Sequence, residues 1–136
     1  MPAASTPPAW ALESAVARLA TTDGERPHVV PVVFCELDGA LVIPVDGKRK
    51  SGARLKRLRN IERNAAVAVL IDRYSEDWSE LRWTRIDGRA EIVASDDATR
   101  AALEAKYAQY EHVEIGTTAI RITIECVTSW SAKGYG

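Results

Sequence analysis

The sequence predicts a mainly β domain, an antiparallel barrel or sandwich with helices packed outside its strands. Residues 120–126 alternate strictly between isoleucine or cysteine and polar residues, and this period of two is typical of a half-buried strand. Asp38-Gly39 joins two apolar segments, which indicates a hairpin. Helical patterns stand between other apolar segments, so we expect about six strands and three helices.

The first element is expected to be a helix over residues 9–20. Four apolar residues lie roughly on one face of such a helix: Trp10, Leu12, Val16 and Leu19. The breaker signals Asp23-Gly24 and Pro27 would end it.

Residues 28–37 (HVVPVVFCEL) then predict a strand rich in β-branched residues. Pro31 inside it favours an edge strand or a bulge, because proline has no N–H for a central ladder. The Asp38-Gly39 turn leads into a second strand over residues 40–45.

The second half of the chain predicts two strands, a helix and the alternating last strand. Residues 65–72 (AAVAVLID) form a short buried strand, and residues 81–94 form a long one in which Gly88 marks a bulge. The polar loop between them carries Asp77 and Glu80, interpreted as surface charges. Ser95, followed by two aspartates, predicts the N-cap of a helix that continues to residue 110.

A length of 136 residues predicts a single domain over residues 9–136, after a flexible lead-in over residues 1–8. The apolar share of 46% and charged share of 27% are those of an ordinary soluble protein. No segment approaches the ~20 apolar residues of a membrane span. Glu13 and Arg18 interrupt any signal-peptide pattern, so we expect a cytoplasmic protein.

Outside the basic segment, the residues capable of chemistry favour structural roles. Cys35 and Cys126 stand in apolar strand segments, which predicts two buried reduced thiols. No Cys/His cluster has the spacing of a zinc site. His28 is able to donate a proton, but packing at a strand end is the favoured interpretation. Three tyrosines and the four tryptophans are interpreted as structural; the tyrosines are Tyr74, Tyr107 and Tyr110.

Positive charge is concentrated between residues 48 and 63. This segment holds eight Lys/Arg and one acid, a charge of +7, so the remainder carries −8 within the net −1 of the chain. We expect a helix from an N-cap at Ser51 to about Asn64, with an apolar stripe packed on the sheet. The stripe is Leu55, Leu58 and Ile61; Arg54 and Arg57 flank it, and Lys56, Arg59 and Arg63 face water.

The cations at the start of this helix predict a phosphate site. Lys48 and Lys50 precede the helix, where its free N–H groups and positive dipole end favour an anion. Cations there oppose the dipole, so a bound anion is the better explanation for Lys48, Lys50, Ser51 and Arg57. A solvated face explains the remaining cations. Nucleic acid is disfavoured because the rest of the chain is acidic and the segment has no aromatic residue to stack on bases.

Five segments resemble a known family in their order and spacing. They are VARLATTDGERPHVVPVVF, LVIPVDGKRK, LKRLRNIERN, AVLIDRYSEDWSELRWTRIDGRAEIV and AIRITIECVTSW. Together they are similar to the pyridoxamine 5′-phosphate oxidase-like split β-barrel proteins, and most closely to the deazaflavin-dependent branch, the F420-dependent oxidoreductases. The resemblance covers roughly residues 14–132, and RPHVVPV, LKRLRNIERN and SEDW before RWTRIDGRA carry most of it.

The resemblance implies a six-stranded antiparallel Greek-key split β-barrel, of the FMN-binding split-barrel type, and a homodimer with cofactor sites at the subunit interface. Phosphate binding maps onto a strand end and the basic helix, and the cofactor ring onto the strand HVVPVV. Trp83 or Trp78 would come from the partner subunit. The implied contacts are Lys48, Lys50, Ser51, Lys56 and Arg57 for the phosphate, and Val30, Pro31 and Val32 for the ring.

The activity implied is hydride transfer between reduced F420 and a small unsaturated or quinone-like substrate, with no catalytic acid identified. An FMN-dependent oxidase or reductase is the alternative enzyme, and a flavin- or haem-binding module without turnover is the alternative of another class. Haem needs an axial ligand, and the chain has only two histidines. The extra cations Lys48 and Arg49 suit the oligoglutamate tail of F420, beyond the phosphate where FMN ends.

Overall fold

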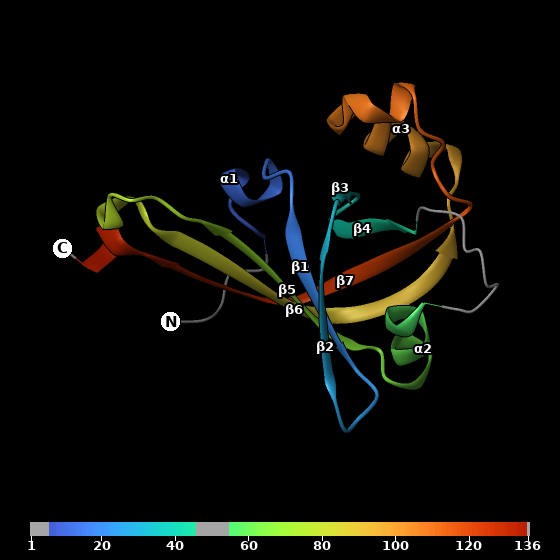
Figure 1. The fold of residues 1–136 in the computed structure, drawn as a ribbon, viewed down its shortest axis with the longest axis horizontal. Coiled ribbons are helices and arrows are strands. Elements are labelled where there is room, and N and C mark those ends of the chain that lie inside the picture. Colours follow the sequence, from blue (N-terminus) through green and yellow to red (C-terminus); the bar gives the residue numbers. More distant parts are fainter. Residues whose placement is uncertain (1–5, 46–54, 136) are drawn as a thin grey trace.

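Seven antiparallel strands form one sheet in the computed structural model, which describes residues 6–45 and 55–135 (Figure 1). The strands are β1 (Ala17–Thr22), β2 (Pro27–Val32), β3 (Cys35–Leu37), β4 (Ala40–Val45), β5 (Ala66–Arg73), β6 (Arg82–Ala94) and β7 (Thr118–Ser131). The helices of the described chain are α1 (Ala9–Leu12), α2 (Lys56–Arg63) and α3 (Asp97–Lys106), with 3₁₀ turns η1 (Trp78–Glu80), η2 (Ala108–Glu111) and η3 (Ala132–Tyr135).

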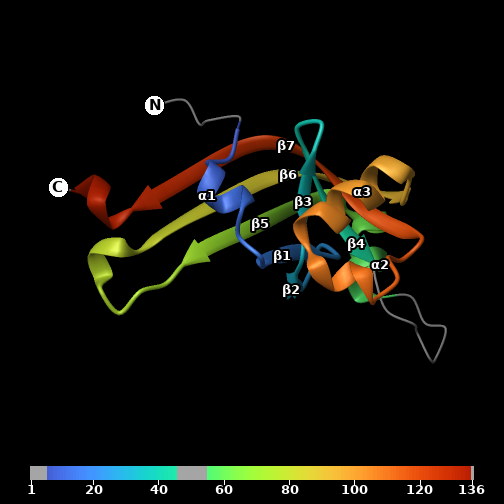
Figure 2. The same ribbon diagram turned by 90° about the horizontal axis from the view of Figure 1, so that it is seen from above.

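The sheet is open and strongly curled. Its order is β2-β1-β5-β6-β7-β4-β3, so β2 and β3 are the two edges. Only Val33 and Phe34 connect these edges, so the sheet must curl until the end of β2 lies within about 11 Å of the start of β3. In Figures 1 and 2, β1 and β2 cross close to β3 and β4, while β5, β6 and β7 extend together as a long arm.

The six-stranded barrel expected from the sequence is therefore wrong in two respects: the strands number seven, and the sheet they form is not closed. Residues 17–22 form the strand β1, which corrects the helix expected over residues 9–20, and the single strand expected over residues 28–37 is divided into β2 and β3. The helix α1 ends at Leu12, and β1 buries Ala17, Leu19 and Thr21 alternately while it pairs with β2 and β5. A short apolar segment fits both periods, and here strand pairing decides.

Other local predictions are confirmed. Asp38 and Gly39 have φ values of 52° and 79°, as a two-residue hairpin turn between β3 and β4 requires. Pro31 lies on an edge strand, although the expected strand over residues 28–37 is divided into β2 and β3. The β6–β7 register shifts between Asp87 and Gly88, and a methyl group at Gly88 would overlap the Thr123 carbonyl. The bulge thus requires glycine.

Two helix starts differ from expectation. Asp96, not Ser95, caps α3: its carboxylate accepts the Thr99 N–H at 2.8 Å, which lowers the pKa of Asp96. The helix α2 begins at Lys56 with Leu55 as its N-cap, later than a start at Ser51, and residue 51 itself lies outside the described residues. Most of the expected flexible lead-in, residues 1–5, also lies outside them.

Two apolar clusters hold the fold together. The larger cluster fills the curled sheet; its fully buried members include Leu19, Phe34, Leu41, Ile43 and Ile71. The smaller one lies under α3, where Leu103 and Tyr107 cover Cys35 and Val42 on the outer side of β3 and β4. This second layer explains why β4 is buried on both faces, and burial raises the pKa of the Cys35 thiol.

Two side chains at the end of α3 close the gap between the sheet edges. The Phe34 N–H donates to the Tyr107 hydroxyl at 3.0 Å, and the Phe34 carbonyl accepts from Lys106 Nζ at 2.8 Å and from the Tyr107 hydroxyl at 2.9 Å. Lys106 Nζ also donates to the Leu12 carbonyl at 2.9 Å. The Tyr107 hydroxyl lies 2.8 Å from the Ala15 carbonyl as well, and its single proton is donated to one of the two carbonyls at a time. Lys106 Nζ also lies 3.6 Å from the centre of the Phe34 ring.

Tyr107→Phe should leave the buried N–H of Phe34 without its acceptor. We expect the free energy of unfolding to fall by about 1–3 kcal/mol, the desolvation penalty of an unsatisfied buried polar group. Urea unfolding measures this loss. The matched control is Tyr74→Phe, at a tyrosine that is 63% exposed, where we expect a change below about 0.5 kcal/mol. Equal losses in the two variants would contradict the role given to Tyr107.

Lys106 should make stability depend on alkaline pH. Burial lowers the pKa of Lys106 from its ordinary value of 10.5 to about 8. Between these values the unfolded chain retains a proton that the folded protein has released, so stability rises with pH across this window and is independent of this group below it. We expect the stability advantage of the wild type over Lys106→Met to grow between pH 8 and 10, measured by urea unfolding. Lys133→Met is the control, and an advantage that stays constant would argue against the prediction.

Candidate functional site

The basic helix α2 is positioned by its apolar stripe, as the sequence predicts. Leu58 and Ile61 are each 5% exposed, and Leu55 packs against the same core. Asn60 is also fully buried, and its amide donates to the Thr21 hydroxyl of β1 at 3.0 Å. The helix therefore rests on β1 through apolar packing and one buried hydrogen bond, with its arginines toward solvent or at the margin of the stripe.

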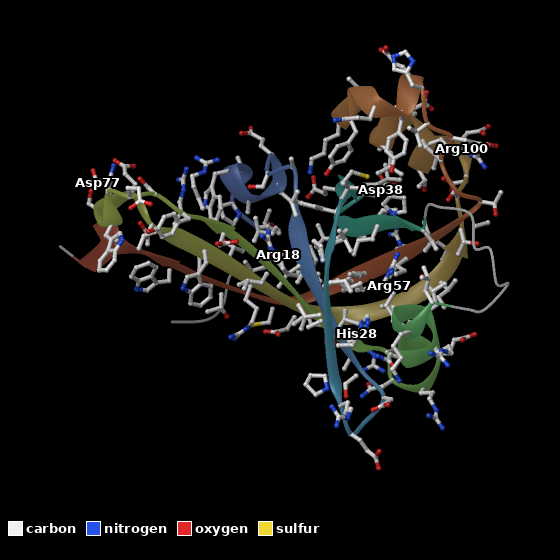
Figure 3. The ribbon with its side chains drawn as sticks, viewed as in Figure 1. Arg18, His28, Asp38, Arg57, Asp77 and Arg100 are labelled. Carbon is white, nitrogen blue, oxygen red and sulfur yellow. The ribbon has the colours of Figure 1, made fainter. Side chains whose placement is uncertain are left out.

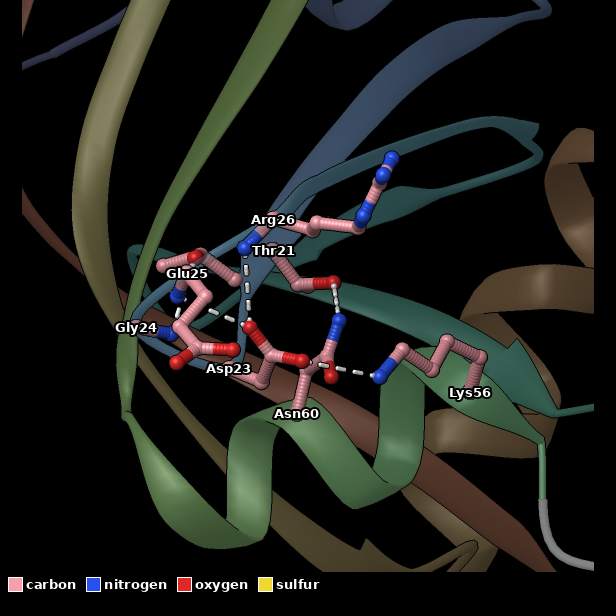
Figure 4. A network of polar contacts seen from close by, with 8 residues as sticks. Thr21, Asp23, Gly24, Glu25, Arg26, Lys56 and Asn60 are labelled. Atoms are coloured by element: carbon pink, nitrogen blue, oxygen red, sulfur yellow. Dashed lines mark hydrogen bonds and ion pairs between the residues drawn. The ribbon is translucent and has the colours of Figure 1, made fainter.

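Lys56 has a partner that sequence analysis missed. Its ammonium group lies 3.1 Å from Asp23 Oδ2 in the β1–β2 turn (Figure 4). The Asp23 carboxylate also accepts the backbone N–H groups of Arg26 and Glu25 at 2.9 Å, and these two bonds, with Lys56, hold the pKa of Asp23 well below its usual range. Asp23-Gly24 is recognisable in sequence only as a turn, so nothing local indicates this ion pair.

A hollow of about 300 Å³ lies beside the exposed face of α2. Three cations line it, together with Asn60 and Glu62. They are Lys56, Arg59 and Arg63, the side chains expected to face water. Arg59 and Arg63 are indeed exposed, so the hollow is shallow and open to solvent.

Arg57 and His28 occupy the other side of the helix. Both are half-buried, and Figure 3 labels His28 on β2 and Arg57 on α2. The Nδ1 atom of His28 is buried and has no hydrogen-bond partner among the described residues. A buried imidazole nitrogen without a partner fits an incoming oxyanion, to which a protonated imidazole nitrogen and a guanidinium are both able to donate.

The strand predicted to contact the cofactor ring is the free edge β2. Val30 is half-buried, Val32 is 8% exposed, and Pro31 points to the opposite, exposed face. His28, Val30 and Val32 thus share the inward side of the strand. The unpartnered imidazole therefore lies on the same face as the expected ring contacts Val30 and Val32. The alternation of side chains along a strand already implies this arrangement for HVVPV in the sequence.

Trp83 lies away from α2, on the outer face of the arm. It lines a hollow of about 610 Å³ with Leu70 and three charged residues. These are Arg18, Asp72 and Arg85. Asp72 lies 3.9 Å from Arg18, and Arg85 pairs with Asp87 at 3.3 Å. Trp83 pairs with Asp72 near the end of β5, about 20 Å along that strand from the end adjoining α2. Within one chain, Trp83 and α2 do not meet.

The remaining predicted contacts, Lys48, Lys50 and Ser51, lie outside the described residues. Within the described ranges, no group of three or more His, Cys, Asp or Glu side chains is placed to hold a metal ion. None of the helices described there has the length and apolar character needed to span a bilayer.

Comparisons with known proteins identify the fold. No curated protein matches the sequence. Solved structures that resemble it include General Stress Protein 26 from Bacillus anthracis, with 18% identity, 88% of each chain covered and a TM-score of 0.64. A FAD-binding protein from Mesorhizobium loti has 22% identity and a TM-score of 0.62, with 87% of this chain and 86% of that chain covered. The conserved hypothetical protein Rv2991 from Mycobacterium tuberculosis has 20% identity and a TM-score of 0.68, with 90% and 81% covered.

At these identities the structures show the fold alone. The family described as pyridoxamine 5′-phosphate oxidase matches residues 9–131 of the sequence, a range that includes the whole sheet and every described residue of the candidate site. By this match, the chain belongs to the pyridoxamine 5′-phosphate oxidase family.

Proposed function

We propose that this protein is an oxidoreductase of a small organic substrate that uses a flavin-type cofactor, and specifically F420. The observation that carries the proposal is the buried, unpartnered Nδ1 of His28 on the edge strand β2. The half-buried Arg57 of the basic helix α2 adds a guanidinium for the phosphate. Membership of a family that includes oxidases supports it. The cofactor would supply the hydride chemistry when bound.

The residues of the chain would bind and orient this cofactor. Arg57 would donate to phosphate oxygens, with Lys48, Lys50 and Ser51 as further contacts from the preceding segment. Lys56, which already pairs with Asp23, would add charge while holding α2 to the β1–β2 turn. The ring would lie along β2, with Val30 and Val32 as contacts that exclude water from one side; Pro31, predicted as a third contact, points to the opposite face.

FMN is the second candidate cofactor. The likeness to a FAD-binding protein from Mesorhizobium loti favours an ordinary flavin, whereas the charge of the basic segment favours the longer polyanionic tail of F420. A module that binds cofactor without turnover would carry the same binding residues. Titration with each cofactor distinguishes F420 from FMN. Oxidation or reduction of a substrate by the loaded protein distinguishes an enzyme from a module that only binds cofactor.

The position of Trp83 supports a homodimer with shared sites. Because Trp83 lies about 20 Å along β5 from the α2 end, one chain does not bring both to a single ring. A two-fold arrangement of two copies, with the outer face of one arm over the β2 edge of the other, would supply Trp83 from the partner.

Arg57→Ala should weaken F420 binding by about tenfold or more, the value of a charge-assisted hydrogen bond to phosphate. Quenching of F420 fluorescence on titration measures the affinity. Arg59→Ala, at the exposed arginine two residues later, is the matched control and should change it by less than about twofold. In parallel titrations, tight binding of FMN with no binding of F420 would reject the F420 assignment while leaving a flavoprotein.

Subunit mixing tests whether each site is built from two chains. Arg57→Ala and Trp83→Ala chains each weaken both sites of their own homodimer. In a mixed dimer, one site would carry both substitutions and the other none, so mixing should restore tight binding at about a quarter of all sites. Sedimentation must first show that both variants remain dimeric. If mixing restores no tight sites, Trp83 and Arg57 do not act from different copies on one cofactor.

A further inference from the structure

Two arginines lie directly opposite each other on the inner face of the arm. Arg73 of β5 pairs with Arg82 of β6, and Arg82 pairs in turn with Ser131 of β7. The preceding row on this face holds Ile71 and Thr84, both fully buried. Like charges directly opposite on neighbouring strands repel, so this pair needs a compensating interaction.

Trp10 supplies part of that compensation. Its ring centre lies 4.6 Å from the Arg82 guanidinium carbon and 5.7 Å from that of Arg73, within the range of a cation–π interaction. Figures 1 and 2 show α1, which carries Trp10, lying over the arm. The aromatic face attracts the cations but accepts none of their N–H groups in the way that a carboxylate does.

No carboxylate of the described residues pairs with either arginine. Nearby acids are engaged elsewhere: Asp72 pairs with Arg18 at 3.9 Å, and Glu80 pairs with Lys133 at 3.3 Å. Each guanidinium carries five N–H groups in a planar fork that suits an oxyanion. Within the described chain, this row therefore holds two positive charges and no negative one.

A hollow of about 370 Å³ opens beside Arg82. Its walls include Trp10, Trp130, Ser129, Ser131 and Pro8. The Ser129 hydroxyl already bonds to the Thr84 hydroxyl at 2.9 Å. The indole of Trp10, a cationic end and a serine hydroxyl at Ser131 suit a planar ligand with one oxyanion group, and the volume lies in the range of small-molecule sites.

We propose that this hollow binds a small aromatic carboxylic acid, its carboxylate on Arg82, with the charge of Arg73 adding to the attraction, and its ring against Trp10. The site is distinct from the proposed cofactor site, because Arg82 and Trp83 are consecutive residues of a strand and point to opposite faces of the sheet. It does not depend on the proposed function, since no residue of α2 or β2 contributes to it.

Isothermal titration of the full chain with benzoate tests the proposal. We expect binding that weakens by about tenfold or more in Arg82→Gln, and by a smaller factor in Arg73→Gln, whose arginine is more exposed. The matched control is Arg89→Gln, an exposed arginine of the same strand, which should bind benzoate within about twofold of the wild type. Acetate and inorganic phosphate, which lack a ring, should bind more weakly than benzoate.

Three outcomes would overturn the proposal. Undiminished benzoate affinity in Arg82→Gln would show that the guanidinium of Arg82 does not hold the carboxylate. Acetate or phosphate binding as tightly as benzoate would show that the Trp10 ring does not contact the ligand. Loss of F420 and FMN binding in a folded Arg82→Gln would assign the hollow to the cofactor site. If Arg82→Gln does not fold, Arg73→Gln carries the same comparisons, because removing one of two opposed like charges relieves repulsion.

Discussion

The structure depends on how its curled sheet is closed without a hydrogen-bonded ladder between its two edges. Phe34, fully buried at the junction of β2 and β3, has backbone groups that no strand satisfies, and Lys106 and Tyr107 of α3 satisfy them instead. Since the same side chains also hold the Leu12 and Ala15 carbonyls, they join α1, β1, β2 and β3 at one point. A buried N–H or C=O left unpaired is costly, so these two residues determine where β2 can lie.

This closure also fixes the surface that the proposed cofactor would contact. With the end of β2 held by α3 and its start held by the Asp23–Lys56 ion pair and the adjacent turn, the strand is tied at both ends to elements outside the sheet. The basic helix is tied to β1 through Asn60 and Thr21. The strand and the helix that carry His28 and Arg57 are therefore held by packing within the chain, so the proposed cofactor phosphate would bind with little reorganisation.

What could be predicted from the sequence are the features with local causes. Asp38-Gly39, Gly88 and the alternation of β7 each arise from the requirements of a turn, a bulge or a half-buried strand. The fold of residues 17–22 could not be predicted, because a short apolar segment fits helix and strand alike until β5 pairs with it. The apolar stripe of α2 could also be predicted, because it follows from the helical spacing of neighbouring residues. Lys56 with Asp23, 33 residues apart, and Trp10 with Arg82 depend on the folded chain.

The two prolines of β2 have a consequence for solution behaviour. An unpaired edge strand is a template on which another chain can add a strand and start ordered aggregation. Pro27 and Pro31 both lie on this edge, paired with β1 on its other side, and proline is tolerated there because its nitrogen faces away from the ladder. Because those two residues have no N–H group, an approaching strand would meet mostly carbonyl acceptors on this edge. The prolines therefore block strand addition at β2, the edge whose outer backbone groups have no partner strand.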